Sequence, residues 1–249
     1  MRSLRYNEFF RSISFANVNL DKLNGQFDRY GNEHICSETA AGTPVKLSAE
    51  ELQTSCLLVQ EVRALAMTVR NLRRMDFTSS ISRKPQDFVI DGDNRDIGCG
   101  IVEAVFPLCK NQDTNVDWII LNNIELGDTD LDYLVAAAVE RDCHFRAIEM
   151  SRCGLNDRSL GLILEALRAQ DNTLEALDIS GNVARLRPSI FDGQISVFGF
   201  IRKLNLSNVS RTTVSEPLLS FETLLSWKLE ELFLNGTPIN ANTLDAIAS

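Results

Sequence analysis

The residue types that most often hold metals or carry out catalysis are few and scattered in this chain of 249 residues. His34 and His144 are its only histidines, and Cys143 beside His144 does not have the spacing of metal ligands. Gly98-Cys99-Gly100 lacks the rest of a dinucleotide-binding fingerprint, and neither a phosphate loop nor a nucleophile elbow occurs. The sequence therefore predicts no cofactor, no metal site and no enzymatic activity, and it argues against a small-molecule substrate.

One acidic stretch, Asp91-Gly-Asp93-Asn-Arg-Asp96, begins like a calcium-binding loop. Such a loop needs a glycine at its sixth place for a sharp turn and a glutamate at its twelfth as a bidentate ligand. Neither residue is present here. We therefore interpret the stretch as an acidic loop.

Cysteine usage and targeting signals indicate the compartment. No apolar run reaches the roughly 20 residues that cross a bilayer, and residues 1–8 lack the apolar core of a signal peptide. The six cysteines contain no C-x-x-C pair, and all precede residue 154: Cys36, Cys56, Cys99, Cys109, Cys143 and Cys153. We expect a cytoplasmic protein with reduced thiols and no transmembrane segment.

The overall charge limits the class of partner. The chain has 34 acidic and 25 basic residues, which gives a formal net charge of -9. A general nucleic-acid binder would carry a basic excess, so we predict no nucleic-acid partner. Six basic residues nevertheless gather in one region, either as a solvated face or as a contact for an acidic partner: Arg63, Arg70, Arg73, Arg74, Arg83 and Lys84.

A repeated phrase defines the elements that must position any site. Five copies begin 29, 29, 27 and 28 residues apart, at Val116, Phe145, Leu174, Ile201 and Leu229. In each copy, apolar residues at alternating positions predict a short strand, and a residue such as Asn182 closes the following turn. Residues 126–138 and 155–167 then repeat apolar residues three and four apart, which is typical of amphipathic helices. One strand and one helix per unit predict an α/β leucine-rich-repeat solenoid, a horseshoe with a parallel concave sheet and convex helices.

The first 115 residues carry the phrase twice, at Phe10 and Leu72, at longer intervals of 62 and 44 residues. Each of these units must contain an insertion, and residues 21–43 and 79–98 are polar enough to predict loops. Ser48-Ala-Glu-Glu51 is a capping box, which predicts a helix from Ser48 whose apolar face extends to Val69. Further helices are expected over 101–108 and 242–249.

We expect a single array of about seven repeats over residues 1–249, two of them with insertions. Residues 1–115 would form irregular repeats, and residues 116–249 regular repeats of 27–29 residues. Neither end resembles the polar unit that caps a solenoid. The chain is therefore expected to be a segment of a longer protein or to contact another protein at its ends.

Strand residues that alternate with the apolar ones would point out from the concave face and form columns. One column alternates in charge and predicts a ladder of ion pairs, with a ligand site as the alternative: Asp117, Arg146, Glu175, Arg202 and Glu230. The central columns place Trp118 and Phe233 beside charged residues, as in protein-binding hot spots. We predict that nine residues bind a partner: Arg74, Trp118, Ile120, Glu149, Asp178, Lys203, Asn205, Glu231 and Phe233. The alternative is that the preceding insertion covers Trp118 and further repeats cover Phe233.

Phrases such as Leu121-Asn-Asn-Ile-Glu-Leu126 and Leu177-Asp-Ile-Ser-Gly-Asn182 resemble the ribonuclease-inhibitor class of leucine-rich repeats. The resemblance is firm over residues 116–249 and loose over 1–115. It implies a cytosolic, non-enzymatic scaffold or adaptor that binds another protein, such as the CARMIL regulators of actin capping protein.

The same class includes GTPase-activating proteins of Ran, which carry an important arginine in a loop after an early repeat strand. Arg83, with Arg95 second, lies in a corresponding loop of this chain. The match is one of position and not of motif, and the long acidic tail of that family is absent. Activation of a Ran-like GTPase in trans is therefore the alternative function.

Overall fold

The computed structural model describes residues 1–24, 55–85 and 96–248. Seven parallel strands form one sheet in the order of the chain: β1 (Ser12–Ser14), β2 (Arg74–Asp76), β3 (Trp118–Ile120), β4 (Ala147–Glu149), β5 (Ala176–Asp178), β7 (Lys203–Asn205) and β9 (Glu231–Phe233). Each strand lies near the start of one copy of the phrase. The prediction of an α/β fold built on a parallel sheet is confirmed.

The strands pair in register, so that equivalent residues of the phrase lie side by side. The central residue of each strand belongs to one row, in which Leu177 pairs with Leu204 and Leu204 with Leu232. This row is buried from β1 to β7, and Leu232 is half-buried on the edge strand β9. Because burial of a leucine side chain is worth about 1.5–3 kcal/mol, the row holds neighbouring units together.

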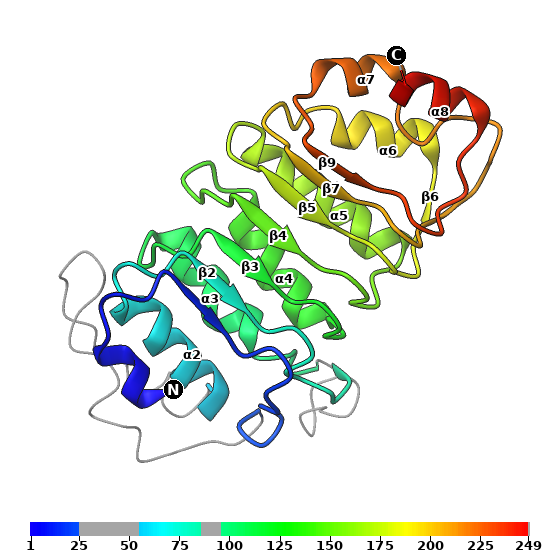
Figure 1. Ribbon diagram of the computed structural model, residues 1–249. Helices are drawn as coiled ribbons and strands as arrows, with labels where there is room; N and C mark the ends of the chain where they lie inside the picture. Colours follow the sequence, from blue (N-terminus) through cyan, green and yellow to red (C-terminus); the bar gives the residue numbers. More distant parts are fainter. Residues whose placement is uncertain (25–54, 86–95, 249) are drawn as a thin grey trace.

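Helices lie along one side of the sheet, and the other side carries none in the described ranges (Figure 1). Neighbouring helices pack side by side in chain order: α2 (Leu57–Thr68), α3 (Ile101–Asn111), α4 (Asp128–Ala138), α5 (Asp157–Leu167) and α6 (Pro188–Ile195). The predicted helices over 101–108, 126–138 and 155–167 are thus confirmed.

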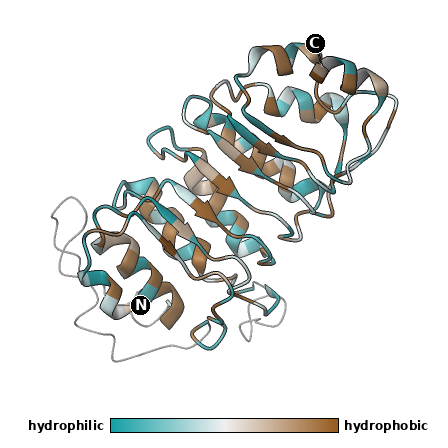
Figure 2. Cartoon of the chain, in the orientation of Figure 1, coloured by the Kyte–Doolittle hydropathy of each residue, from teal (hydrophilic) through white to brown (hydrophobic). Residues whose placement is uncertain are grey.

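Shorter elements complete the two ends. The 3-10 helix η1 (Arg2–Tyr6) packs on α2, and η3 (Arg168–Gln170) extends α5. Near the C-terminus, β6 (Arg185–Leu186) pairs with β8 (Ser210–Arg211), and α7 (Phe221–Ser226) contacts α8 (Ala241–Ala248). Hydrophobic residues lie along the strands and on the helices behind them (Figure 2), and their buried members form one continuous core.

The start of α2 differs from the prediction. Ser48 to Glu51 lie outside the described residues, but α2 begins at Leu57, with Cys56 as its N-cap in an extended conformation. A continuous helix from Ser48 is therefore wrong. The capping box is a local signal, whereas the observed start is fixed by a distant contact in which the Leu58 N–H donates to the Leu23 carbonyl at 3.1 Å. Most of the two predicted loops also lies outside the described residues.

In the turn after every strand, one residue adopts the left-handed conformation. It lies seven places after the phrase start in every case: Asn17, Ser79, Asn123, Arg152, Gly181, Asn208 and Gly236. Their φ angles lie between 53° and 69°. Glycine and asparagine tolerate this conformation best, which explains why they hold five of the seven positions. All seven strands are therefore followed by a turn of the same kind, although the sequences differ.

Asn182 closes the turn after β5 with a buried side chain. Its carbonyl oxygen accepts hydrogen bonds from the N–H groups of Cys153 and Leu155 at 2.9 and 3.1 Å. Its amide nitrogen donates to the carbonyls of Met150 and Ile179, each at 2.8 Å. One side chain thus satisfies backbone groups of two adjacent units, which is the role expected for this place in the phrase.

Asp130 joins α4 to the segment that precedes α3. Its buried carboxylate accepts hydrogen bonds from the Cys99 N–H at 2.9 and 3.0 Å and from the Gly127 N–H at 3.0 Å. Burial raises the pKa of Asp130 to about 6, because the loss of water disfavours the charged form by more than these hydrogen bonds favour it.

Gly181→Ala should lower the free energy of unfolding by about 1–2 kcal/mol, because alanine is strained in the left-handed region. Its Cβ would also lie 2.8 Å from the Cγ atom of Arg152. Urea denaturation followed by circular dichroism measures the loss. Gly193→Ala is the matched control, since the added Cβ meets nothing within 4 Å in α6, and it should raise stability. Adding Arg152→Ala to Gly181→Ala should restore part of the loss, because it removes the contacting atoms but keeps a non-glycine residue in the left-handed turn. An unrestored double variant would contradict the contact.

Stability should also depend on pH through Asp130. Its pKa rises from 3.8 to about 6 on folding, so the folded protein keeps a proton that the unfolded chain loses between these values. Its contribution to stability is therefore complete below about pH 4 and declines as the pH rises to about 6. The free energy of unfolding of the Asp130→Asn variant, relative to that of the wild type, should rise by up to about 1.4 kcal/mol per pH unit in this interval. Urea denaturation across the interval measures this, and a constant difference between the two proteins would be the contrary result.

Candidate functional site

The candidate site is the helix-free face of the sheet, formed by the first and third residues of each strand. Of the nine residues predicted to bind a partner, eight lie on this face with half-buried or exposed side chains: Arg74, Trp118, Glu149, Asp178, Lys203, Asn205, Glu231 and Phe233. Ile120 is the exception, since only 3% of it is exposed. We call this surface the open face.

A first cluster on the open face holds an aromatic ring between a cation and an acid. The Arg74 guanidinium lies 5.9 Å from the centroid of the Trp118 ring, and Nε1 of Trp118 donates to Glu149 Oε1 at 3.0 Å. Arg74 also donates to the Ser12 hydroxyl at 3.3 Å and lies 3.8 Å from the Asp76 carboxylate. These contacts fix the orientation of the indole ring before any partner arrives.

The same cluster explains why Ile120 is not a contact residue. Trp118 pairs with Ala147, and Ile120 pairs with Glu149, so the Trp118–Glu149 hydrogen bond crosses the face diagonally. It passes between Ile120 and Ala147, both of which are buried. The prediction for Ile120 is wrong because the two larger side chains beside it close over the position.

A second cluster lies at the other end of the face and repeats the same chemistry. The ammonium group of Lys203 lies 5.5 Å from the centroid of the Phe233 ring and 3.3 Å from the Glu231 carboxylate. A cation above an aromatic face is attracted to the ring by about 0.5–1 kcal/mol at an exposed site. Phe233 is thereby held between β7 and β9 with part of its surface free.

Between the clusters the open face carries small side chains and carboxylates. Ala147 and Ala176 occupy the row of Trp118 and Lys203, and both are buried. Next to them are the carboxylates of Glu149 and Asp178, the latter accepting from the Asn205 amide at 2.8 Å. We call this part the acidic trough. Trp118 and Phe233 stand on either side of it, and no segment among the described residues buries either ring completely.

The predicted charge ladder is present only in part at the amino ends of the strands. Arg146 lies 2.9 Å from Glu175, whereas Arg202 donates to the Lys228 carbonyl at 2.9 Å, and Asp117 pairs instead with Arg73, outside the predicted column, at 3.1 Å. Burial raises the pKa of Asp117, whereas the hydrogen bond from Arg146 lowers that of Glu175. These pairs line a hollow of about 620 Å³ that also includes His144. Arg73 directly follows the phrase start Leu72, so the column could have been extended to it from sequence.

The basic cluster predicted from sequence does not form one patch. Arg73 belongs to the ladder, Arg74 to the open face, and Lys84 lies 3.7 Å from the Glu125 carboxylate. Arg63 instead donates to the Glu103 carbonyl at 3.5 Å. Arg83 is exposed in the segment after β2, and Arg95 lies outside the described residues. GTPase activation through either arginine stays a prediction.

The cysteines offer no activated nucleophile in the described ranges. No disulfide joins the five described cysteines, all of which are buried: Cys56, Cys99, Cys109, Cys143 and Cys153. Burial raises the pKa of Cys99 and raises that of Cys153 to about 12. The hydrogen bond with Cys143, together with burial, raises the pKa of Cys109, so these three thiols stay protonated. The prediction of reduced thiols stays a prediction, and Cys36 lies outside the described residues.

The described residues contain no group of three or more histidine, cysteine, aspartate or glutamate side chains placed to hold a metal ion. None of the helices in the described ranges combines the length and the apolar character that crossing a membrane requires.

Comparison with known proteins finds similarity among solved structures. No family model matches this chain, and a search of curated proteins finds no match. Among solved structures, the chain is similar to the tropomodulin C-terminal domain from Caenorhabditis elegans, with 13% sequence identity and a TM-score of 0.41. The similarity covers 59% of this chain and 89% of that chain.

The ladder should contribute little to stability, because both partners of the Arg146–Glu175 pair are more than 40% exposed. Arg146→Ala is expected to lower the free energy of unfolding by about 0.2–1 kcal/mol, and the loss should shrink in about 1 M salt. Urea denaturation at low and high salt tests this. Arg141→Ala, at an exposed position before β4, is the control. A loss above about 2 kcal/mol would show that the pair is structurally essential.

Proposed function

We propose that this chain is a non-enzymatic protein-binding module, a leucine-rich-repeat horseshoe that binds its partner through the open face of the sheet. The observation that carries the proposal is the pair of cation–aromatic clusters on either side of the acidic trough. Trp118 and Phe233 are four strands apart, which separates their backbones by about 19 Å. That span suits a folded protein surface or an extended segment better than a small molecule.

The repeat architecture is supported by three independent features. The phrase recurs at 27–29 residues over the C-terminal half, the strands align in register, and the left-handed turn recurs in all seven units. In such arrays the side chains of successive strands form one continuous surface. We propose that this continuity is what the partner recognises.

The chemistry of the trough indicates what a partner would present. Glu149 is held by Trp118, and Asp178 by Asn205, so both carboxylates are oriented but keep acceptor capacity for a further donor. An arginine or lysine from the partner would fit between the rings, with its charge near the carboxylates and its methylene groups against the aromatic surface. Because the acids are already ordered, binding would cost little side-chain entropy.

A narrower proposal is that the partner belongs to the actin-capping machinery, as in a cytoskeletal regulator. It rests on the resemblance of the repeats to the ribonuclease-inhibitor class, which includes the CARMIL regulators. Purified actin-capping protein and actin filaments are the direct probes. Lack of binding to both would remove this narrower proposal and leave the open-face proposal standing.

Site-specific crosslinking tests the open face itself. A photo-reactive amino acid at Glu231, on the open face, should crosslink the partner, whereas the same residue at Asp132, exposed on α4, should not. Equal crosslinking at both positions, or crosslinking at Asp132 alone, would place the interface elsewhere.

Trp118→Ala combined with Phe233→Ala should weaken partner binding by about 30-fold or more, the effect of losing hot-spot aromatics. Both rings are partly exposed, so the thermal midpoint should fall by only a few degrees. Binding is measured by biolayer interferometry with the crosslinked partner after its purification. Glu149→Gln with Asp178→Asn isolates the trough, because it keeps the side-chain shape while removing charge. Unchanged affinity in both double variants would overturn the proposal.

A further inference from the structure

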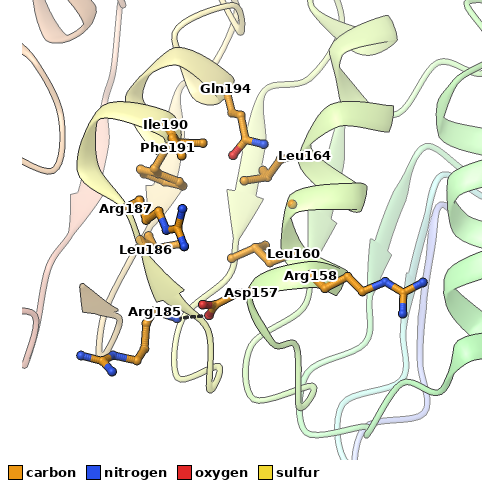
Figure 3. Close-up of a pocket in the computed structure, with 11 residues that line it drawn as sticks. Asp157, Arg158, Leu160, Leu164, Arg185, Leu186, Arg187, Ile190, Phe191 and Gln194 are labelled. Atoms are coloured by element: carbon orange, nitrogen blue, oxygen red, sulfur yellow. Dashed lines mark hydrogen bonds between the residues drawn. The ribbon is translucent and has the colours of Figure 1, made fainter. Parts of the chain in front are cut away.

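A slot on the helix side of the molecule lies between α5 and α6. It has a volume of about 380 Å³, and α5, α6 and the short strand β6 contribute its walls (Figure 3). Its floor is apolar and buried, formed by Leu160, Leu164, Leu186 and Phe191, while Ile190 is about half exposed at the rim. This side of the sheet is opposite to the open face, so the slot is independent of the proposed function.

A helical glycine leaves the slot open. Gly161 lies within α5, and a Cβ atom added there would meet nothing within 4 Å. Glycine in a helix interior costs about 1 kcal/mol relative to alanine. Close packing does not require a glycine at this position, because the space beside it is empty. The slot is therefore wide at the point where a side chain would otherwise narrow it.

One end of the slot is electropositive. Arg158, Arg185 and Arg187 line it, and Asp157 is the one carboxylate among the lining residues. The Asp157 carboxylate already accepts from the Arg185 N–H at 2.6 Å. In Figure 3 the Arg187 side chain lies over the slot beside Leu186, while the side chains of Arg158 and Arg185 extend away from the slot in opposite directions.

The helix ends add to this charge. Both α5 and α6 begin at the arginine end, so their positive dipole ends lie there. Asn156 caps the first turn of α5, whereas no side chain caps α6, which begins with Pro188. In a chain with a net charge of -9, this is a local site for an anionic group beside an apolar floor.

We propose that the slot between α5 and α6 binds an acidic amphipathic peptide segment of a partner protein. One large apolar side chain of the peptide lies on Leu160, Leu164 and Phe191, and a following carboxylate pairs with Arg187. Charge complementarity selects this occupant, because a basic peptide would meet three arginines and one carboxylate that is already hydrogen-bonded. Burial of an apolar anchor supplies affinity, and the arginines fix its direction.

The test uses a fluorescein-labelled peptide of about twelve residues, with two leucines one helical turn apart among glutamates and alanines. Its binding to the whole chain is followed by fluorescence anisotropy. We expect saturable binding that is lost when the glutamates are replaced by lysines or the leucines by serines. No binding at millimolar protein, or equal binding of the lysine peptide, would overturn the proposal.

Two variants localise the binding. Gly161→Leu fills the slot at a place with room for it and strengthens the helix, so the protein should fold and bind at least about tenfold more weakly, a loss of about 1.4 kcal/mol. Arg187→Glu should weaken binding similarly. Arg168→Glu, in η3 outside the slot, changes the net charge equally and should leave affinity within about twofold. Affinity unchanged by Gly161→Leu would contradict the site.

A free fatty acid also combines an apolar chain and a carboxylate. Sodium laurate is therefore tested separately as a competitor of the peptide. The proposal expects laurate to compete with the peptide only weakly, because it supplies a single carboxylate for three arginines. Tighter binding of laurate than of the peptide at the same slot would replace the peptide as occupant and overturn the proposal.

Discussion

The structure depends on one constraint: a strand of three residues cannot bury its own apolar side chain and must place it beside an equivalent one. Leu177 is buried because Leu204 lies beside it and helices lie behind it. The same dependence passes along the sheet from β1 to β9. Every other feature, including the identical turns and the side-by-side helices, follows from keeping that row in register.

This constraint also determines what the open face can be. Because register is fixed by the core row, the first and third residues of each strand are aligned across the sheet without being selected for packing. Trp118, Glu149 and Lys203 are therefore free to carry binding chemistry. The slot between α5 and α6 arises differently, from a glycine in α5 and a short helix α6, so the two surfaces do not share residues.

Much of this arrangement could be predicted from the spacing of apolar residues. A period of two within each strand and of about 28 between strands assigns every residue to a column. The neighbours of Trp118, Asp178 and Phe233 were accordingly predicted correctly. Ile120 was not, because its burial depends on the direction in which the Trp118 side chain turns, and a column position carries no such information.

Other features were not predicted for the same reason: they depend on contacts between residues that are distant in the sequence. The capping box at Ser48 is a local pattern, but a hydrogen bond to the Leu23 carbonyl fixes where α2 begins. The slot lined by Arg187 was not foreseen, because it depends on how two helices of neighbouring units diverge. Gly161 was a possible signal, since a glycine inside an amphipathic helix weakens it without an evident local reason.

The half-buried Leu232 on the edge strand β9 has a consequence for dynamics. In an array whose units contact only their neighbours, free energies of local opening are set unit by unit. Phe145 and Ile148 are enclosed on both sides, whereas Leu229, Leu232 and Leu234 are only partly covered. Amide protons should therefore exchange with solvent more slowly around β4 than at β9. Phe233, which one binding cluster requires, thus lies on a strand whose local opening costs less free energy than that of β4.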